Sequence, residues 1–185
     1  LHKNAGGLNQ CALLHVSKNT NFDWREIQNF INLFHTSSPS YPLIANIEAN
    51  INFLSSSKGQ KTIDDLISNI SKFQKILKNE GFEFLVEKYT DLTKIMLKLN
   101  GADCLKLSDV LFDKYGIEDE IASHFSCLYL TGIGTTKTKL DRLKAALIDV
   151  KNKKFNEILS NEVKTPVFQP YPLLKLQPWE AFNRD

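Results

Sequence analysis

The spacing of apolar residues changes once along this chain, near Gly81, and that change constrains the fold more than any other feature. Between residues 23 and 80 the apolar side chains recur with helical spacing in three successive stretches. After Gly81, short apolar runs with strand character alternate with further helical patterns. The resulting order of helix, strand, helix, strand, strand and helix predicts a small α+β domain.

The first helix is predicted from its capping pattern. Asp23 is followed three residues later by Glu26, and the apolar positions of this stretch share one helical face: Trp24, Ile27, Phe30, Ile31 and Phe34. This helix should end before Pro39, because a proline disfavours helical backbone at the residue that precedes it.

Two more helices are predicted before the change of pattern. One covers about residues 43–55, and Lys58-Gly59-Gln60 is expected to break the helical pattern after it. Thr62 is the expected cap of the next helix, whose apolar stripe continues to a stop at Gly81.

Four segments are candidates for strands. Residues 11–16 form a continuous apolar run and predict a short buried strand. Residues 94–99 have strand character and precede the turn signal Asn100-Gly101. Residues 117–121 and 127–130 are both compatible with strands.

Glycine, threonine and proline mark the remaining boundaries. A helix is expected to end at Gly116 in a left-handed cap, and Thr135 or Thr136 should cap the last long helix. Residues 165–178 contain four prolines and no clear period, which predicts an extended arm.

Composition excludes several classes of protein. A net charge of +2 is too small to favour nucleic-acid binding, and no run approaches the ~18 apolar residues of a membrane span, so we expect neither partner. The histidines and cysteines lack metal-ligand spacing, so we expect no metal site. Cys11, Cys104 and Cys127 are odd in number and far apart, which suits buried thiols in a reducing, cytoplasmic environment.

The sequence around Lys3 resembles a known cofactor-attachment region. His2-Lys3, the following Gly-Gly turn, Gln10 and the apolar run after it are similar to the pyridoxal-phosphate attachment region of the ornithine/lysine/arginine decarboxylase family, of fold type I. Five further segments resemble family motifs in family order: 34–43, 91–95, 114–118, 128–134 and 178–182. Leu92 and Trp179 depart from the family pattern, which has Pro and Arg there.

The resemblance implies roles for four residues. Lys3 would form the Schiff base with pyridoxal 5'-phosphate, and His2 beside it would contact the cofactor phosphate, as an imidazole N–H suits an anionic oxygen. Thr36 and Ser37 lie in a loop that would bind phosphate and cross a dimer interface to complete the partner's site. Taken alone, Lys3 could equally be an exposed lysine, His2 a packing residue, and Thr36 and Ser37 helix caps.

The resemblance also implies an α/β fold in three parts. Residues 1–80 would be the C-terminal end of a pyridoxal-phosphate-binding large domain, 81–160 the small α+β domain, and 161–185 a truncated Pro-rich arm. Because Leu1 lies almost on the reactive lysine, we expect a C-terminal piece of a longer enzyme that is inactive alone.

The implied activity is decarboxylation of arginine, lysine or ornithine to a polyamine precursor, in a homodimer or higher homo-oligomer. Two alternatives remain open at this point. One is an aminotransferase-like pyridoxal-phosphate enzyme, which would need an arginine to bind the substrate carboxylate. The other is a non-catalytic assembly module that uses its apolar helices and arm.

Overall fold

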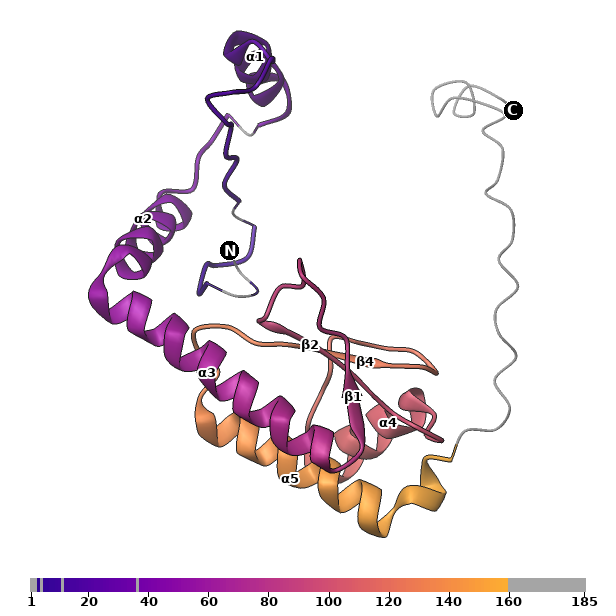
Figure 1. Ribbon diagram of the computed structural model, residues 1–185. Helices are drawn as coiled ribbons and strands as arrows, with labels where there is room; N and C mark the ends of the chain where they lie inside the picture. Colours follow the sequence, from indigo (N-terminus) through magenta and orange to yellow (C-terminus); the bar gives the residue numbers. More distant parts are fainter. Residues whose placement is uncertain (1–2, 4, 11, 36, 160–185) are drawn as a thin grey trace, which may run out of the picture.

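The computed structural model describes residues 3, 5–10, 12–35 and 37–159. Helices and strands follow one another as shown in Figure 1: α1 (Trp24–Phe34), α2 (Tyr41–Ser55), α3 (Ser57–Asn79), β1 (Phe82–Phe84), β2 (Lys94–Leu99), α4 (Cys104–Tyr115), β3 (Ile121–Ala122), β4 (Cys127–Leu130), α5 (Lys137–Lys153) and the 3-10 turn η1 (Phe155–Glu157). No helix within these residues is long and apolar enough to cross a bilayer.

An antiparallel sheet forms the centre of the second half. Its strand order is β1-β2-β4-β3, and β2 pairs with β4 in the register Ile95↔Tyr129. Side chains alternate along β2, so that Ile95 and Leu97 are buried whereas Lys94 and Lys98 are exposed. One face of the sheet is therefore apolar and must be covered.

Helices α3, α4 and α5 cover that apolar face (Figure 1). The core combines side chains from all three helices with those of the strands; its helical members include Leu66, Ile70, Phe73, Leu77, Leu107, Leu111, Leu140, Leu143, Leu147 and Val150. Helix α3 thus belongs to the core of the sheet, although it precedes the first strand in sequence.

Local capping signals explain most helix ends. The Asp23 carboxylate accepts a hydrogen bond from the Arg25 amide at the start of α1. Gly116 ends α4 with φ +59°, and Thr136 caps α5. The predicted helices that begin near 23, 43 and 137, the strands at 94–99 and 127–130, and the turn at Asn100-Gly101 are confirmed.

The predicted helix break at Lys58-Gly59-Gln60 is wrong, because these residues lie in the first turn of α3. Ser56 caps this helix by accepting a hydrogen bond from the Gly59 amide at 3.1 Å. A Cβ atom at Gly59 would lie 2.0 Å from the carbonyl oxygen of Phe53 in α2. Glycine is needed here for the close approach of two helices, and it does not interrupt the second one.

Two strand predictions are wrong wholly or in part. Residues 12–16 form no strand, and Leu14 is 67% exposed. A buried strand needs neighbours on both sides, and none of the four strands in the described sheet pairs with this run. Within 117–121 only Ile121 is in a strand, because the Ile117 amide turns back to the Leu111 carbonyl at the end of α4. The predicted arm lies outside the described residues.

Candidate functional site

The loop that carries Lys3 lies beside the sheet. The Lys3 ammonium contacts the carboxylate of Glu120, and 47% of the Lys3 side chain remains accessible to solvent. Glu120 immediately precedes β3, and its backbone amide donates to the Leu128 carbonyl of β4 at 2.8 Å. The sheet therefore fixes the backbone of the residue that pairs with Lys3.

Gly6 lets the same loop pack closely against its surroundings. Its φ is +74°, in the left-handed region that favours glycine. A Cβ atom on this residue would lie 2.9 Å from Asn50 Oδ1 and 3.0 Å from Ile133 Cδ1. At Gly6 the loop thus packs against α2 and against the segment that joins β4 to α5.

Two asparagines of α2 bind the backbone of this loop. The Asn50 side chain donates through Nδ2 to the Gly6 carbonyl at 3.2 Å and to the Asn46 carbonyl at 2.8 Å. The Asn46 side chain accepts a hydrogen bond from the Leu8 amide at 2.8 Å. Asn50 is about nine-tenths buried, which is unusual for an amide side chain unless its polar atoms are bonded.

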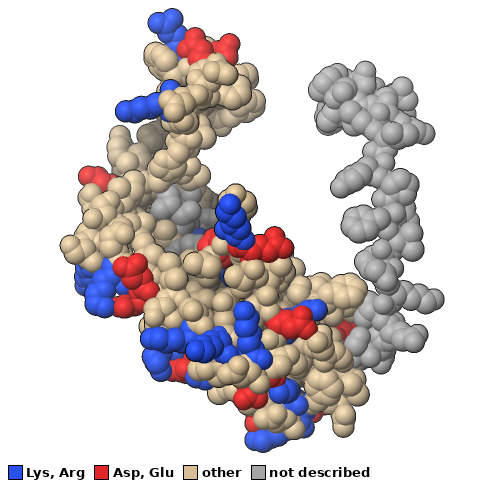
Figure 2. All heavy atoms as spheres, viewed as in Figure 1, with Lys and Arg blue, Asp and Glu red and all other residues tan. Residues whose placement is uncertain are grey.

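Three consecutive acidic residues stand next to Lys3. Glu118, Asp119 and Glu120 line a cavity of about 360 Å³ together with Leu130. Asp119 accepts a hydrogen bond from the Ser108 hydroxyl at 2.9 Å, which ties the acidic segment to α4. Figure 2 shows acidic and basic side chains side by side on the surface that faces the hollow below α1. This arrangement provides negative charge close to an accessible amine.

The other predicted site residues are less informative. His2 and Thr36 lie outside the described residues. Ser37 is exposed and lies in the segment between α1 and α2. Lys3 contacts Glu120 and not Ser37.

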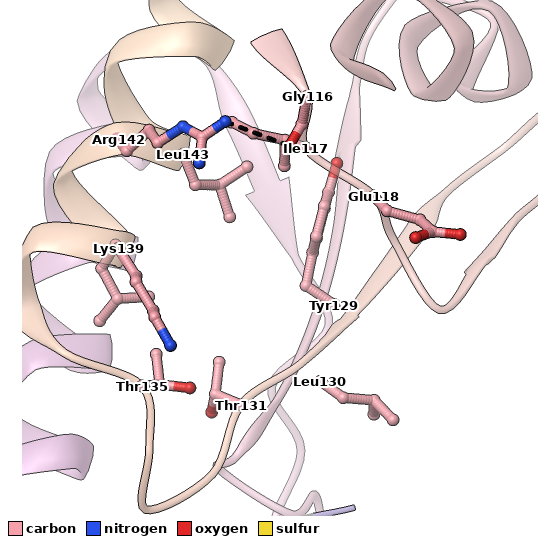
Figure 3. Close-up of a pocket in the computed structure, with 11 residues that line it drawn as sticks. Gly116, Ile117, Glu118, Tyr129, Leu130, Thr131, Thr135, Lys139, Arg142 and Leu143 are labelled. Atoms are coloured by element: carbon pink, nitrogen blue, oxygen red, sulfur yellow. Dashed lines mark hydrogen bonds between the residues drawn. The ribbon is translucent and has the colours of Figure 1, made fainter. Parts of the chain in front are cut away.

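A separate cavity of about 220 Å³ lies between α5 and β4 (Figure 3). Its two cations already bind backbone carbonyls: Arg142 donates to Gly116 O at 3.1 Å, and Lys139 donates to Gly134 O at 3.0 Å. Tyr129 lines the cavity, and burial raises the pKa of its hydroxyl. The hydrogen bond from Arg142 holds the end of α4, and Glu118 lines both this cavity and the one beside the acidic segment.

Cys104 and Cys127 behave as small apolar residues of the core, as predicted. Both are free thiols with no exposed surface, and Cys127 Sγ donates to the Cys104 carbonyl at 3.2 Å. The neighbouring thiol and burial raise the pKa of Cys127, which keeps it protonated. Cys11 lies outside the described residues. The described part of the chain holds no group of three or more side chains suited to a metal ion.

Comparison with known proteins identifies the family. Residues 1–96 match the family described as Orn/Lys/Arg decarboxylase, major domain. This match covers the Lys3 loop, α1, α2, α3 and the start of β2. The chain therefore belongs to the Orn/Lys/Arg decarboxylase family.

Individual relatives agree with this assignment. The chain is 27% identical over 194 residues to an arginine decarboxylase of Bacillus anthracis and to one of Bacillus cereus, and both alignments cover 98% of the chain. They cover 39% and 42% of those relatives, so the chain spans about two fifths of their length.

Solved structures share the fold. The constitutive lysine decarboxylase of Escherichia coli superposes with a TM-score of 0.59 over 71% of this chain and 25% of its own, at 21% identity. The lysine decarboxylase of Francisella novicida superposes equally well at 19% identity, over 71% of this chain and 24% of its own.

Proposed function

We propose that this chain is part of a pyridoxal-phosphate-dependent decarboxylase of arginine, lysine or ornithine. The observation that carries the proposal is the family match over residues 1–96, a stretch that includes Lys3 and the loop that Asn50 binds at Gly6. The relatives are named arginine and lysine decarboxylases, which supports a basic amino acid as substrate.

The exposure and position of Lys3 fit the cofactor. The amine of Lys3 is half exposed, so a pyridoxal aldehyde can reach it, and the Lys3 loop cannot fold away while α2 binds Gly6 and Leu8. Lys3 would hold the cofactor covalently, His2 would contact its phosphate, and Thr36 and Ser37 would contact the phosphate in the site of a second subunit. Bound in this way, pyridoxal phosphate supplies the electron sink that decarboxylation at Cα requires.

The acidic segment contributes binding and orientation. The carboxylate of Glu120 holds the charged amine of Lys3 at the sheet edge, and Glu118 and Asp119 add negative charge to the same cavity. Such a field attracts the cationic side chain of arginine, lysine or ornithine and disfavours acidic amino acids.

The arginines favour a decarboxylase over an aminotransferase. An aminotransferase would need a free guanidinium for the substrate carboxylate. Among the described arginines, Arg142 binds the carbonyls of Tyr115 and Gly116, and Arg25 lies over the ring of Trp24 at 5.8 Å. Both guanidinium groups are therefore already engaged.

We also propose that the chain divides near residue 81, with residues 1–80 completing a cofactor-binding domain, residues 81–160 forming the small domain and residues 161–185 an arm. The sheet begins at Phe82, which supports this division. Helix α3 packs Leu66, Phe73 and Leu77 into the core under the sheet and so connects the two parts.

Reductive trapping tests the proposed function. The intact protein that carries this chain is incubated with pyridoxal phosphate and treated with borohydride, which reduces a carbon–nitrogen double bond to a stable single bond. Peptide mapping is expected to find the label on Lys3 and not on Lys18, an exposed lysine of the same segment. A label on another lysine would remove the basis of the site assignment.

We also propose that the protein forms a homodimer or a higher homo-oligomer. Helix α1 has no buried residue, and its apolar side chains are open: Trp24 is 67%, Phe30 63% and Phe34 81% exposed. An amphipathic helix with an uncovered apolar face marks an interface. We propose that a second subunit contacts it and that Thr36 and Ser37, which follow α1, reach that subunit's site.

Replacing Phe34 with aspartate is expected to reduce the size of the assembly, because it places a charge in the apolar interface. Asn29→Asp, an exposed polar position on the same helix, is the matched control and should leave the assembly intact. Analytical ultracentrifugation at several concentrations measures both. A wild-type protein that stays monomeric at micromolar concentration, or an unchanged Phe34→Asp assembly, would refute the proposed interface.

A further inference from the structure

The position of Lys3 depends on contacts made far from it in sequence. The Asn46 side chain binds the Leu8 amide across 38 residues, and Asn50 binds the Gly6 carbonyl across 44 residues. The two asparagines are four residues apart, so they lie on the same face of α2. Together they bind both a donor and an acceptor of the loop backbone.

The backbone partners determine how each asparagine uses its amide group. A peptide N–H can only donate, so the atom of Asn46 that faces Leu8 must be its oxygen. A peptide carbonyl can only accept, so the atom of Asn50 that faces Gly6 must be its nitrogen. The second proton of that nitrogen goes to the Asn46 carbonyl. Asn46 is therefore an acceptor and Asn50 a double donor.

Close packing at Gly6 further restricts the movement of the loop backbone. Asn50 Oδ1 and Ile133 Cδ1 both lie where a side chain would project from the Gly6 Cα, so a methyl group does not fit there. A loop packed against these two residues and bonded at Gly6 and Leu8 restricts where Lys3, three residues before Gly6, can lie. Its ammonium meets Glu120 from this fixed position.

We propose that Asn46 and Asn50 are positioning residues for the reactive lysine. They bind the backbone at Gly6 and Leu8, three and five residues after Lys3, and so help to place its amine beside the acidic segment, where the cofactor and the substrate would meet. The inference rests on the proposed function for the role of Lys3. The contacts themselves can be tested without any cofactor.

The same substitution is expected to release the loop at one position and to leave it unchanged at the other. Asn46→Asp keeps the oxygen that Leu8 needs and should leave the loop in place. Asn50→Asp replaces a double donor with an acceptor facing two carbonyl oxygens, which should release the loop. Asn52→Asp, on an exposed position of α2, is the matched control, and Asn46→Leu removes the acceptor altogether.

Hydrogen exchange of the Leu8 amide is the first measurement. We expect exchange to be about threefold to tenfold faster in Asn50→Asp and Asn46→Leu, as for loss of one net hydrogen bond. Asn46→Asp and Asn52→Asp should match the wild type. Equal effects of Asn→Asp at positions 46 and 50, or no effect at either, would overturn the proposal.

The reactivity of Lys3 is the second measurement. Limited acetylation, read by mass spectrometry as the ratio of Lys3 to Lys18 modification, should rise several-fold in Asn50→Asp because the amine leaves Glu120. If that variant does not fold by circular dichroism, Gly6→Ala provides the same test, since its Cβ would displace the loop from Asn50 and Ile133. An unchanged ratio in a folded variant would count against the proposal.

Trapping with pyridoxal phosphate and borohydride separates this inference from the proposed function. The yield of label on Lys3 should fall in Asn50→Asp relative to Asn52→Asp. If wild-type Lys3 is never labelled, the proposed function fails, whereas exchange and acetylation still decide the role of the asparagines. If Lys3 is labelled equally well in all variants, Asn46 and Asn50 do not position it.

Discussion

Replacing Lys3 with alanine is expected to abolish covalent attachment of pyridoxal phosphate and to lower decarboxylation by roughly 10³-fold or more. The variant lacks the amine that joins the cofactor aldehyde, so the cofactor is no longer held in a fixed orientation. The visible absorbance of the bound cofactor should disappear. Its loss can be measured in the intact protein by spectroscopy, together with carbon dioxide release from arginine, lysine and ornithine.

Two matched variants separate the covalent role of Lys3 from its ion pair. Lys3→Arg keeps a cation beside Glu120 but cannot form the bond, so it should be as inactive as Lys3→Ala. Lys18→Ala removes an exposed lysine of the same segment and should retain cofactor and activity. Activity in Lys3→Arg close to that of the wild type would mean that Lys3 acts through charge alone.

Truncation of Leu147 to alanine is expected to destabilise the protein by about 2–5 kcal/mol. Leu147 has no exposed surface and lies in the middle of α5, under the sheet. A domain of this kind is stable by only ~5–15 kcal/mol, so much of the sheet unit would unfold at moderate denaturant concentration. Urea unfolding followed by circular dichroism measures the change.

Leu105→Ala is the control for the core variant. Leu105 is in α4 and is 37% exposed, so its truncation leaves a smaller cavity and should cost less than ~1.5 kcal/mol. Similar losses at both positions would show that α5 is not the central element of this core.

The sequence is sufficient where local signals decide the structure. The Asp23 cap, the Gly116 stop and the Thr136 cap each act within one helical turn, and the helices they predict are present. Strand β2 was predictable because four of its six residues are apolar and the turn signal Asn100-Gly101 follows it directly.

Prediction from sequence fails where contact with a residue far away in the chain determines the local structure. Strand β1 has three residues, too few to show a period, and exists because β2 pairs with it. Residues 12–16 have the composition of a buried strand but no strand beside them. Gly59 has the appearance of a helix breaker, and only the position of Phe53 shows why glycine is there.

The residues of the candidate site also differ in whether a local motif or only the folded chain identifies them. Lys3 is identified by motif, because the residues around it are contiguous. Asn46 and Asn50 are ordinary helical asparagines in sequence, and their contacts with the Lys3 loop appear only when the chain has folded. Glu120 belongs to no motif in the sequence, and its contact with Lys3, 117 residues away, appears only in the folded chain.

The contact between Lys3 and Glu120 has a consequence for the order of folding. It closes a loop of 117 residues, which costs about 4 kcal/mol in chain entropy by (3/2)RT ln n. An exposed ion pair returns only about 0–1 kcal/mol, so it cannot close that loop by itself. The sheet and its three covering helices must form first and bring Glu120 to the place where the amine arrives. The chain can therefore hold Lys3 against Glu120 only after its second half has folded, and early intermediates should leave the Lys3 amine unpaired and open to modification.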